Sequence, residues 1–268
     1  MGLKVVTVVN DVNDINFNLL RFSCILNGLE LVVLVSSGKI FHTRRIKDEL
    51  LYDYLSDDSI DDDELIFFTD GTDALLVAGE DEIISKYNAF DKKVVFSAET
   101  GCWPDSSMEK RYPDDNIHTP YKYLNSGGFI GNARTIKDLL EDNDFDLENY
   151  PLSNQYLWAQ RYLKHRDKIA LDFNCDIFCA FFSEEGEEYF PKSDNGDFSQ
   201  YYLYKKEWFH TNFEVIVNRL KNNLTQTFPC HLHFNGTSKF LIDQDIHDMV
   251  YSNIKNYKPV QYYFENEE

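Results

Sequence analysis

The chain has 268 residues, of which 46 are Asp or Glu and 26 are Lys or Arg, so its formal net charge is −20. We expect a chain this acidic to repel nucleic acid and anionic membrane surfaces, because it has no basic stripe to offset the charge. No segment has the length and apolarity of a transmembrane span, and we predict one domain over residues 1–268 with a sizeable core.

The N-terminus runs from Met1 and Gly2 straight into an apolar stretch, without a basic flank, an apolar segment of signal-peptide length or a cleavage site. The five cysteines are an odd number without metal-ligand spacing, which indicates reduced, packed thiols. Both features predict a cytoplasmic protein; the alternative is a secretory-pathway protein whose signal has been removed.

Strands and helices alternate in the first part of the chain. Apolar runs predict strands at 3–9, 29–35, 65–69 and 93–97. Helices are expected from Asn13 or Asp14 to about residue 26, from about 43 to 54, and from about 80 to 87, while the acidic run 57–64 reads as a solvated loop. This order predicts an α/β fold with a mostly parallel sheet, whose ligands bind beyond the carboxyl ends of the strands.

Two carboxylates follow the third predicted strand. A turn at Gly71 can bring Asp70 and Asp73 onto one side, where they could hold one hard divalent cation beside a diphosphate. The alternative is a turn that favours Asp and Gly for local reasons. A phosphatase loop with a nucleophilic aspartate fails, because Phe68 stands where that nucleophile is needed.

Three later segments carry further candidate site residues. Trp103 lies in a polar loop after the strand 93–97, and taken alone it reads more readily as an ordinary core tryptophan than as a site residue. Gly127 and Gly128 indicate that the backbone passes close to a ligand or to another strand. His231 and His233 share one face of a strand, so that one of them could complete a metal shell or contact a phosphate.

The order of these segments identifies a known family. Residues 68–77, 96–104, 124–131, Asp172 with Ile177 and Phe178, and the pattern His233-x-Asn235-Gly236-x-x-Lys239 occur in the same order in one module. They resemble the glycosyltransferase domain of the multifunctional procollagen lysyl hydroxylases, which is related to the collagen hydroxylysine glycosyltransferases. The likeness runs from Val5 to Lys239.

By this resemblance the chain has a GT-A-type, Rossmann-like nucleotide-sugar fold with a UDP-sugar donor and a Mn²⁺ cofactor. The resemblance implies that Asp70, Asp73 and His233 ligate Mn²⁺ and that the loop with Trp103 closes over the donor as part of the catalytic centre. The remaining donor contacts that it implies are, for uridine, Val5, Thr7 and Thr72; for the sugar, Asn125, Gly127 and Gly128; and for the phosphates, Asn235, Gly236 and Lys239. Thr72 departs from the family, which often has an aromatic residue there to pack on uracil.

A second departure concerns the reaction centre. Where the family has a run of aspartates before a helix, this chain reads Leu152-Ser153-Asn154-Gln155. We expect Asn154 to position a sugar hydroxyl through its amide and the Asn154→Asp variant to keep or raise the rate. A shifted loop could alternatively return one of Asp142, Asp144 and Asp146.

The expected activity is Mn²⁺-dependent transfer of a hexose, with retention of configuration, from UDP-glucose or UDP-galactose. The acceptor would be a collagen-like polypeptide bearing hydroxylysine, or another glycan. Two alternatives use the same site: a non-catalytic module that binds UDP-sugar or glycan, and a slow UDP-sugar hydrolase.

Overall fold

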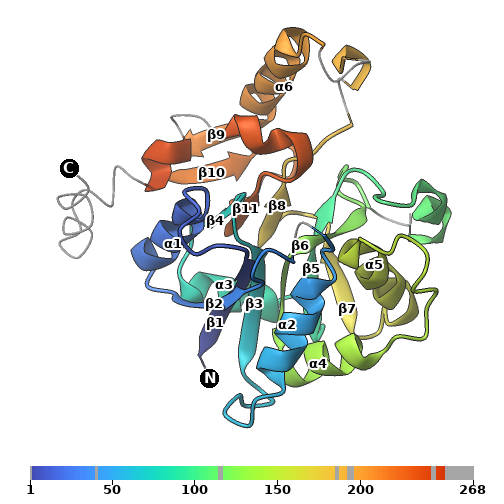
Figure 1. Cartoon of the computed structure of the whole chain (residues 1–268). Helices are drawn as coiled ribbons and strands as arrows, with labels where there is room; N and C mark the ends of the chain where they lie inside the picture. The colour runs from blue at the N-terminus through green and yellow to red at the C-terminus, as the bar shows by residue number, and fades with distance from the viewer. Residues whose placement is uncertain are drawn as a thin grey trace.

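A six-stranded sheet forms the centre of the computed structural model, which describes residues 2–39, 42–113, 117–184, 187–191, 196–242 and 246–250. The strands lie in the order β2-β1-β3-β6-β5-β7 (Figure 1). Their bounds are β1 Leu3–Val9, β2 Glu30–Val35, β3 Leu65–Asp70, β5 Val94–Glu99, β6 Tyr123–Asn132 and β7 Ile169–Asp172. The α/β, Rossmann-like class predicted from the sequence is confirmed.

One strand runs against the others. β6 pairs antiparallel with both β3 and β5, whereas the pairs β1–β2, β1–β3 and β5–β7 are parallel. Phe129 of β6 stacks on Phe68 of β3 at 4.9 Å and on Phe96 of β5 at 4.6 Å between ring centroids. These cross-strand aromatic pairs help to fix β6 between its neighbours. The sheet is therefore mostly parallel, as expected, with β6 as the exception.

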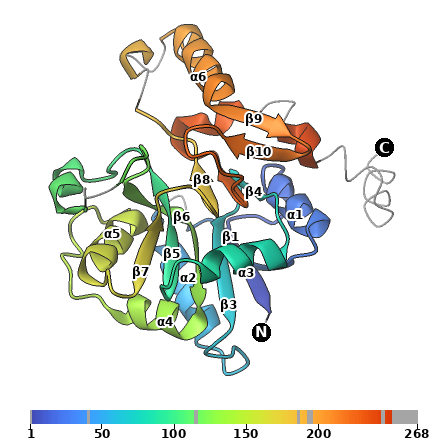
Figure 2. The same cartoon turned by 180° about the vertical axis from the view of Figure 1, so that it is seen from behind.

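Helices cover both faces of this sheet. On one face α2 (Ile46–Leu55), α4 (Ala133–Glu141) and α5 (Asn154–Lys164) pack on the alternate strand residues that include Val6 and Val8. On the other face α3 (Glu80–Asn88) and one side of α1 (Phe17–Leu26) pack on the set that includes Val5 and Val9. Figure 2, seen from behind Figure 1, shows α3 in front of the sheet. Successive side chains of β1 thus point to opposite faces of the sheet and pack in two separate apolar layers.

The predicted helices and strands of the first hundred residues are present, with shifted ends. The largest shift is at α1, which begins at Phe17 and not at Asn13 or Asp14. The carboxylates of Asp11 and Asp14 accept the backbone N–H of Asn13 and Asn16, each at 2.9 Å. These local bonds hold residues 11–16 in turns, which delays the helix.

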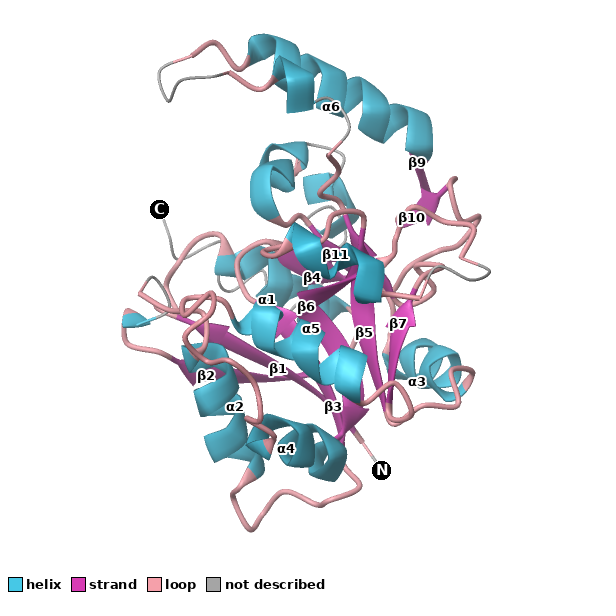
Figure 3. Ribbon diagram, turned by 90° about the vertical axis from the view of Figure 1, so that its right-hand side faces the viewer, coloured by secondary structure: helices cyan, strands magenta, loops and turns pink. Residues whose placement is uncertain are grey.

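A small second sheet lies beyond the carboxyl end of β3. It has the order β4-β11-β8, with bounds β4 Ala74–Leu76, β11 His231–His233 and β8 Phe178–Ala180 (Figure 1). Figure 3 shows β4 and β11 of this sheet next to each other. Asp172, at the end of β7, accepts the backbone N–H of Ile177 at 2.7 Å and of Phe178 at 2.8 Å, which guides the chain into β8. Burial raises the pKa of Asp172 to about 6 despite these donors. The small sheet brings residues near 73 and near 233 together.

The helix α6 (Ser199–Asn212) and the hairpin of β9 (Phe213–Ile216) and β10 (Arg219–Asn222) extend from the end of the molecule that carries the small sheet (Figure 1). Among the described residues, short 3-10 helices cover Ser106–Arg111, Glu187–Tyr189 and Gly236–Leu241. Within the described ranges no helix is both long and apolar enough to cross a lipid bilayer.

Candidate metal centre

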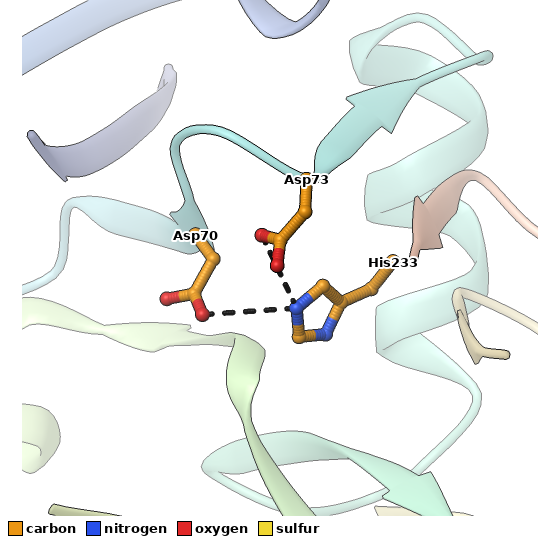
Figure 4. A group of neighbouring side chains, drawn as sticks. All are labelled: Asp70, Asp73 and His233. Atoms are coloured by element: carbon orange, nitrogen blue, oxygen red, sulfur yellow. Dashed lines mark ion pairs between the residues drawn. The ribbon is translucent and has the colours of Figure 1, made fainter. Parts of the chain in front are cut away.

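Asp70, Asp73 and His233 meet at the junction of the two sheets. Figure 4 shows both carboxylates on the turn between β3 and β4, with the imidazole of His233 directed at them. His233 Nε2 lies 3.5 Å from Asp73 Oδ1 and 3.7 Å from Asp70 Oδ2. One ligand atom from each residue lies within 4.8 Å of the other two. The structure thus brings together the three residues expected to ligate the metal.

The turn that presents the two carboxylates depends on Gly71. A Cβ at this position would lie 2.5 Å from Val9 Cγ1 and 3.0 Å from Thr7 Oγ1. Only glycine lets the turn pack this closely on the end of β1. The turn then places Asp70 at the end of one strand and Asp73 at the start of the next, which is the geometry expected from the sequence.

Two lysines flank the carboxylates. Lys47 Nζ of α2 lies 2.5 Å from Asp70 Oδ1, and Lys239 Nζ lies 3.1 Å from Asp73 Oδ2. Each carboxylate therefore gives one oxygen to a lysine and turns the other towards His233. Sequence reasoning placed Lys239 near the phosphates but missed Lys47, because a lysine in a polar helix gives no signal of burial.

The charges of Asp73 and His233 stabilise each other. Burial alone would raise the pKa of Asp73, but His233 and Lys239 hold this pKa well below its ordinary value. Burial likewise opposes protonation of His233, yet the carboxylates of Asp73 and Asp70 raise its pKa above the ordinary value. The site therefore favours a positive charge between Nε2 of His233 and the carboxylates of Asp70 and Asp73.

The donor set fits a divalent cation. His233 Nδ1 lies 3.1 Å from Asn125 Oδ1, an acceptor that also receives the backbone N–H of Gly127 at 3.0 Å. A neutral imidazole that donates from Nδ1 presents the lone pair of Nε2 to two carboxylates. Nε2 is buried and has no hydrogen-bond partner among the described residues. A proton on Nε2 or a cation bound between these three groups would offset the two carboxylate charges.

The close neighbours of the paired glycines are the two histidine rings. A Cβ on Gly127 would lie 2.1 Å from His233 Cε1, and one on Gly128 would lie 2.9 Å from His231 Cε1. His231 is not in the group of ligand atoms: its Nε2 lies 2.7 Å from Thr69 Oγ1, and burial lowers its pKa well below the ordinary value. His233 is thus the histidine at the site, and the glycines make room for the rings.

A buried acid lies beside this centre. Glu99, the last residue of β5, accepts from Gln155 Nε2 at 2.5 Å and from Asn235 Nδ2 at 2.8 Å. Burial raises its pKa to about 7, although these donors and the nearby His233 act in the opposite direction. Gln155 also donates to the carbonyl of Trp103 at 3.1 Å. Sequence reasoning did not assign Glu99 or Gln155 a role, although a carboxylate that ends an apolar strand was a visible signal.

Asn154 lies in a different set of contacts. It is buried at the start of α5, and its Nδ2 donates to Asp48 Oδ1 at 3.1 Å. In the described part of the chain no hydrogen bond or ion pair joins Asn154 to Asp70, Asp73 or His233. Asp142 does not take the place of an acid there, because it is paired with Lys164 and His165 at the other end of α5.

The other residues predicted to contact the donor lie in β1, in the turn after β3, and in the loops with Gly236 and Trp103. Their contacts with a donor stay predictions. Val5 and Thr7 are fully buried in β1, and Thr7 Oγ1 donates to the carbonyl of Thr69 at 2.7 Å. Thr72 is half-buried in the turn. Gly236, which has a φ of 58°, follows Asn235 at the start of a 3-10 helix. The side chain of Trp103 is 50% exposed, with Arg44 over its ring at 6.0 Å.

Comparison with known proteins finds one family. The family model described as "PLOD GT domain" matches residues 3–265. "Uncharacterized protein R699" of Acanthamoeba polyphaga mimivirus is 32% identical over 190 residues, which cover 69% of this chain and 34% of that protein. Procollagen-lysine,2-oxoglutarate 5-dioxygenase 2 of Mus musculus is 30% identical over 206 residues, which cover 74% of this chain and 24% of that protein.

A third relative carries both activities in its name. The multifunctional procollagen lysine hydroxylase and glycosyltransferase LH3 of Homo sapiens is 26% identical over 182 residues, which cover 68% of this chain and 22% of that protein. The chain therefore spans about a third or less of the length of these relatives. Among solved structures, a glycosyltransferase involved in glycosylation of the major capsid of PBCV-1 has a TM-score of 0.42 and 11% identity, covering 92% of this chain and 98% of that one.

Proposed function

Since the chain belongs to the PLOD GT domain family and is thereby a glycosyltransferase domain, we propose that it transfers a hexose from a UDP-sugar with Mn²⁺ as its cation. The donor is UDP-glucose or UDP-galactose. The transfer retains the configuration of the sugar.

The orphaned Nε2 of His233 carries this proposal. It is buried without a hydrogen-bond partner among the described residues, and it faces two carboxylate oxygens at 3.5 and 3.7 Å. Two carboxylates and one imidazole suit Mn²⁺ better than Mg²⁺, which prefers oxygen alone. When bound, such a cation acts as a Lewis acid that stabilises the charge of the diphosphate leaving group.

The residues around the cation position bind the diphosphate, cover the donor and orient His233. Lys239 is 56% exposed and 3.1 Å from Asp73, so it can turn to the diphosphate and add a charge as the glycosyl bond breaks. The half-exposed Trp103 is held by Gln155 through its backbone carbonyl, which leaves the indole ring available to cover the donor. Asn125 fixes the His233 ring from its far side.

The proposed acceptor is a hydroxyl of a hydroxylysine-linked, collagen-like polypeptide or of another glycan. The names of the related proteins, which include a procollagen-lysine dioxygenase and the procollagen lysine hydroxylase and glycosyltransferase LH3, support this choice. The absence of a carboxylate at position 154 favours, as a second candidate, a module that binds UDP-sugar without transferring the sugar. A slow UDP-sugar hydrolase would use the same site.

The test is a screen of UDP-sugars with Mn²⁺, with product analysis in the presence and absence of acceptor. We expect transfer to acceptor in the wild type. Asp70→Ala and Asp73→Ala should each abolish transfer and Mn²⁺-dependent UDP binding, because the remaining ligands leave the cation and the diphosphate uncompensated. Asp58→Ala, which removes an exposed carboxylate from the loop before β3, is the matched control.

Each outcome separates the candidates. Free sugar without acceptor product indicates a hydrolase, and UDP-sugar binding without any turnover indicates a binding module. Unchanged Mn²⁺-dependent UDP affinity in both aspartate variants, measured by titration calorimetry, contradicts the assignment of the site.

A further inference from the structure

Asp48, in the first turn of α2, joins this helix to α5. Its Oδ1 accepts from Asn154 Nδ2 at 3.1 Å and from Trp158 Nε1 at 3.0 Å, and its Oδ2 lies 3.3 Å from an Arg161 guanidinium nitrogen. The three donors are four and three residues apart, so they lie on one face of α5. A single carboxylate thus receives three donors from one helix.

The α5 side of this contact is rigid. Arg161 is 2% exposed, and its other nitrogens donate to the carbonyls of Asp142 at 3.2 Å and Leu140 at 3.3 Å. Its guanidinium also lies 4.7 Å from the centre of the Trp158 ring. Arg161 and Trp158 cannot move without losing these contacts. Their bonds to Asp48 therefore hold α2 in one position against α5.

The residue that precedes Asp48 is Lys47, which pairs with Asp70 at 2.5 Å. Neighbouring residues in a helix point about 100° apart, so Asp48 can face α5 while Lys47 faces the end of β3. Any rotation of α2 that moves Asp48 also moves Lys47. The contact of α2 with α5 and its contact with Asp70 are therefore made by neighbouring residues of the same helical turn.

We propose that Asn154 is a positioning residue that acts through Asp48: it fixes the rotation of α2 that delivers Lys47 to Asp70. This inference rests on the proposed function, in which Asp70, Asp73 and His233 hold a cation beside a diphosphate. Lys47 occupies Oδ1 of Asp70 and leaves Oδ2 turned towards His233. When α2 rotates, Lys47 leaves Asp70 and this orientation of the carboxylate is lost.

A double-mutant cycle tests this relay. Asn154→Ala, Lys47→Met and the double variant are titrated with UDP at saturating Mn²⁺ by calorimetry, and with Mn²⁺ alone by the loss of the free-ion paramagnetic resonance signal. We expect Asn154→Ala to weaken UDP binding about tenfold, in the range of other changes to groups that orient metal ligands. In the Lys47→Met background the same substitution should have no further effect on either affinity.

Asn222→Ala is the matched control, because it also removes a fully buried amide but lies in β10, where it donates to Tyr121. No hydrogen bond among the described residues joins Asn222 to α2. It should leave both affinities unchanged while costing stability. If Asn154→Ala does not fold, Trp158→Phe removes the other donor to Asp48 Oδ1 and should give the same cycle.

Two results overturn the relay: an Asn154→Ala effect of equal size with and without Lys47, or no effect at all. A wild type that binds Mn²⁺ but not UDP refutes the proposed donor instead. In that case the relay is judged on the affinity for Mn²⁺ alone, so the two failures are distinguishable.

Discussion

Gly127→Ala separates the geometry of the metal centre from the general stability of the sheet. The new Cβ would lie 2.1 Å from His233 Cε1, 2.7 Å from Nδ1 and 2.9 Å from Nε2. Ordinary van der Waals contact begins at 3.4 Å, so the ring must retreat by about 1.3 Å. A metal ligand tolerates a displacement of only about 0.2 Å, so this retreat removes the imidazole from the site.

The expected cost has two parts. Overpacking at a buried position destabilises the fold by about 1–3 kcal/mol. Loss of the third ligand should weaken Mn²⁺ binding by at least about 100-fold, because changes to groups that only orient a ligand already cost about 10- to 100-fold. Urea unfolding measures the first part, and Mn²⁺ titration measures the second.

Gly128→Ala provides the matched control. Its Cβ would lie 2.9 Å from His231 Cε1 and 2.9 Å from Phe178 Cδ1, so it strains the same strand without touching His233. We expect a similar loss of stability and a much smaller loss of Mn²⁺ affinity. Equal loss of affinity in both variants, or unchanged affinity in Gly127→Ala, would refute the reasoning. In a His233→Ala background, Gly127→Ala should cost no further affinity, because the ring is gone.

Two further predictions concern buried carboxylates. Because folding raises the pKa of Glu99 from 4.5 to about 7, the folded state binds this proton more tightly than the unfolded chain. The free energy of unfolding should therefore fall by about 3 kcal/mol as pH rises from about 4.5 to about 7. Urea unfolding between about pH 4 and 8 measures this change, and the Glu99→Gln variant should lack it. Asn154→Asp would place a second carboxylate about 3 Å from Asp48, whose pKa burial already raises. We now expect this variant to lose stability and activity at neutral pH, contrary to the expectation from sequence; a rate at or above that of the wild type in the transfer assay would show that the repulsion is relieved.

The sequence predicted the parts of the fold that local patterns encode. The apolar runs that became β1, β3 and β5 and the turn with Asp70 and Asp73 were all visible. The direction of β6 was not, because an apolar strand has the same pattern in either direction, and only its contacts through Phe129 place it between β3 and β5. The strands β4 and β8 have three residues each, too few for a pattern to stand out.

The site was predictable where the resemblance supplied a motif and unpredictable where the contact crosses between helices. His233 was assigned from its motif, although strand periodicity alone left it equal to His231. Lys47 and Asp48 looked like surface residues of a polar helix, because nothing local shows that one meets Asp70 and the other Asn154. Such long-range pairs depend on how α2 and α5 pack, which residue spacing does not encode.

The strand order of the small sheet also constrains when the site can exist during synthesis. β4 and β8 leave the ribosome before β11, yet β11 is the central strand that pairs with both. Until residue 233 has emerged, the nascent chain carries the two aspartates but neither the imidazole nor the strand that holds it. Late long-range pairing of this kind is slow compared with local folding. A partly synthesised chain therefore lacks the complete set of Asp70, Asp73 and His233, so the proposed cation site forms only after β11 has paired with both of its neighbours.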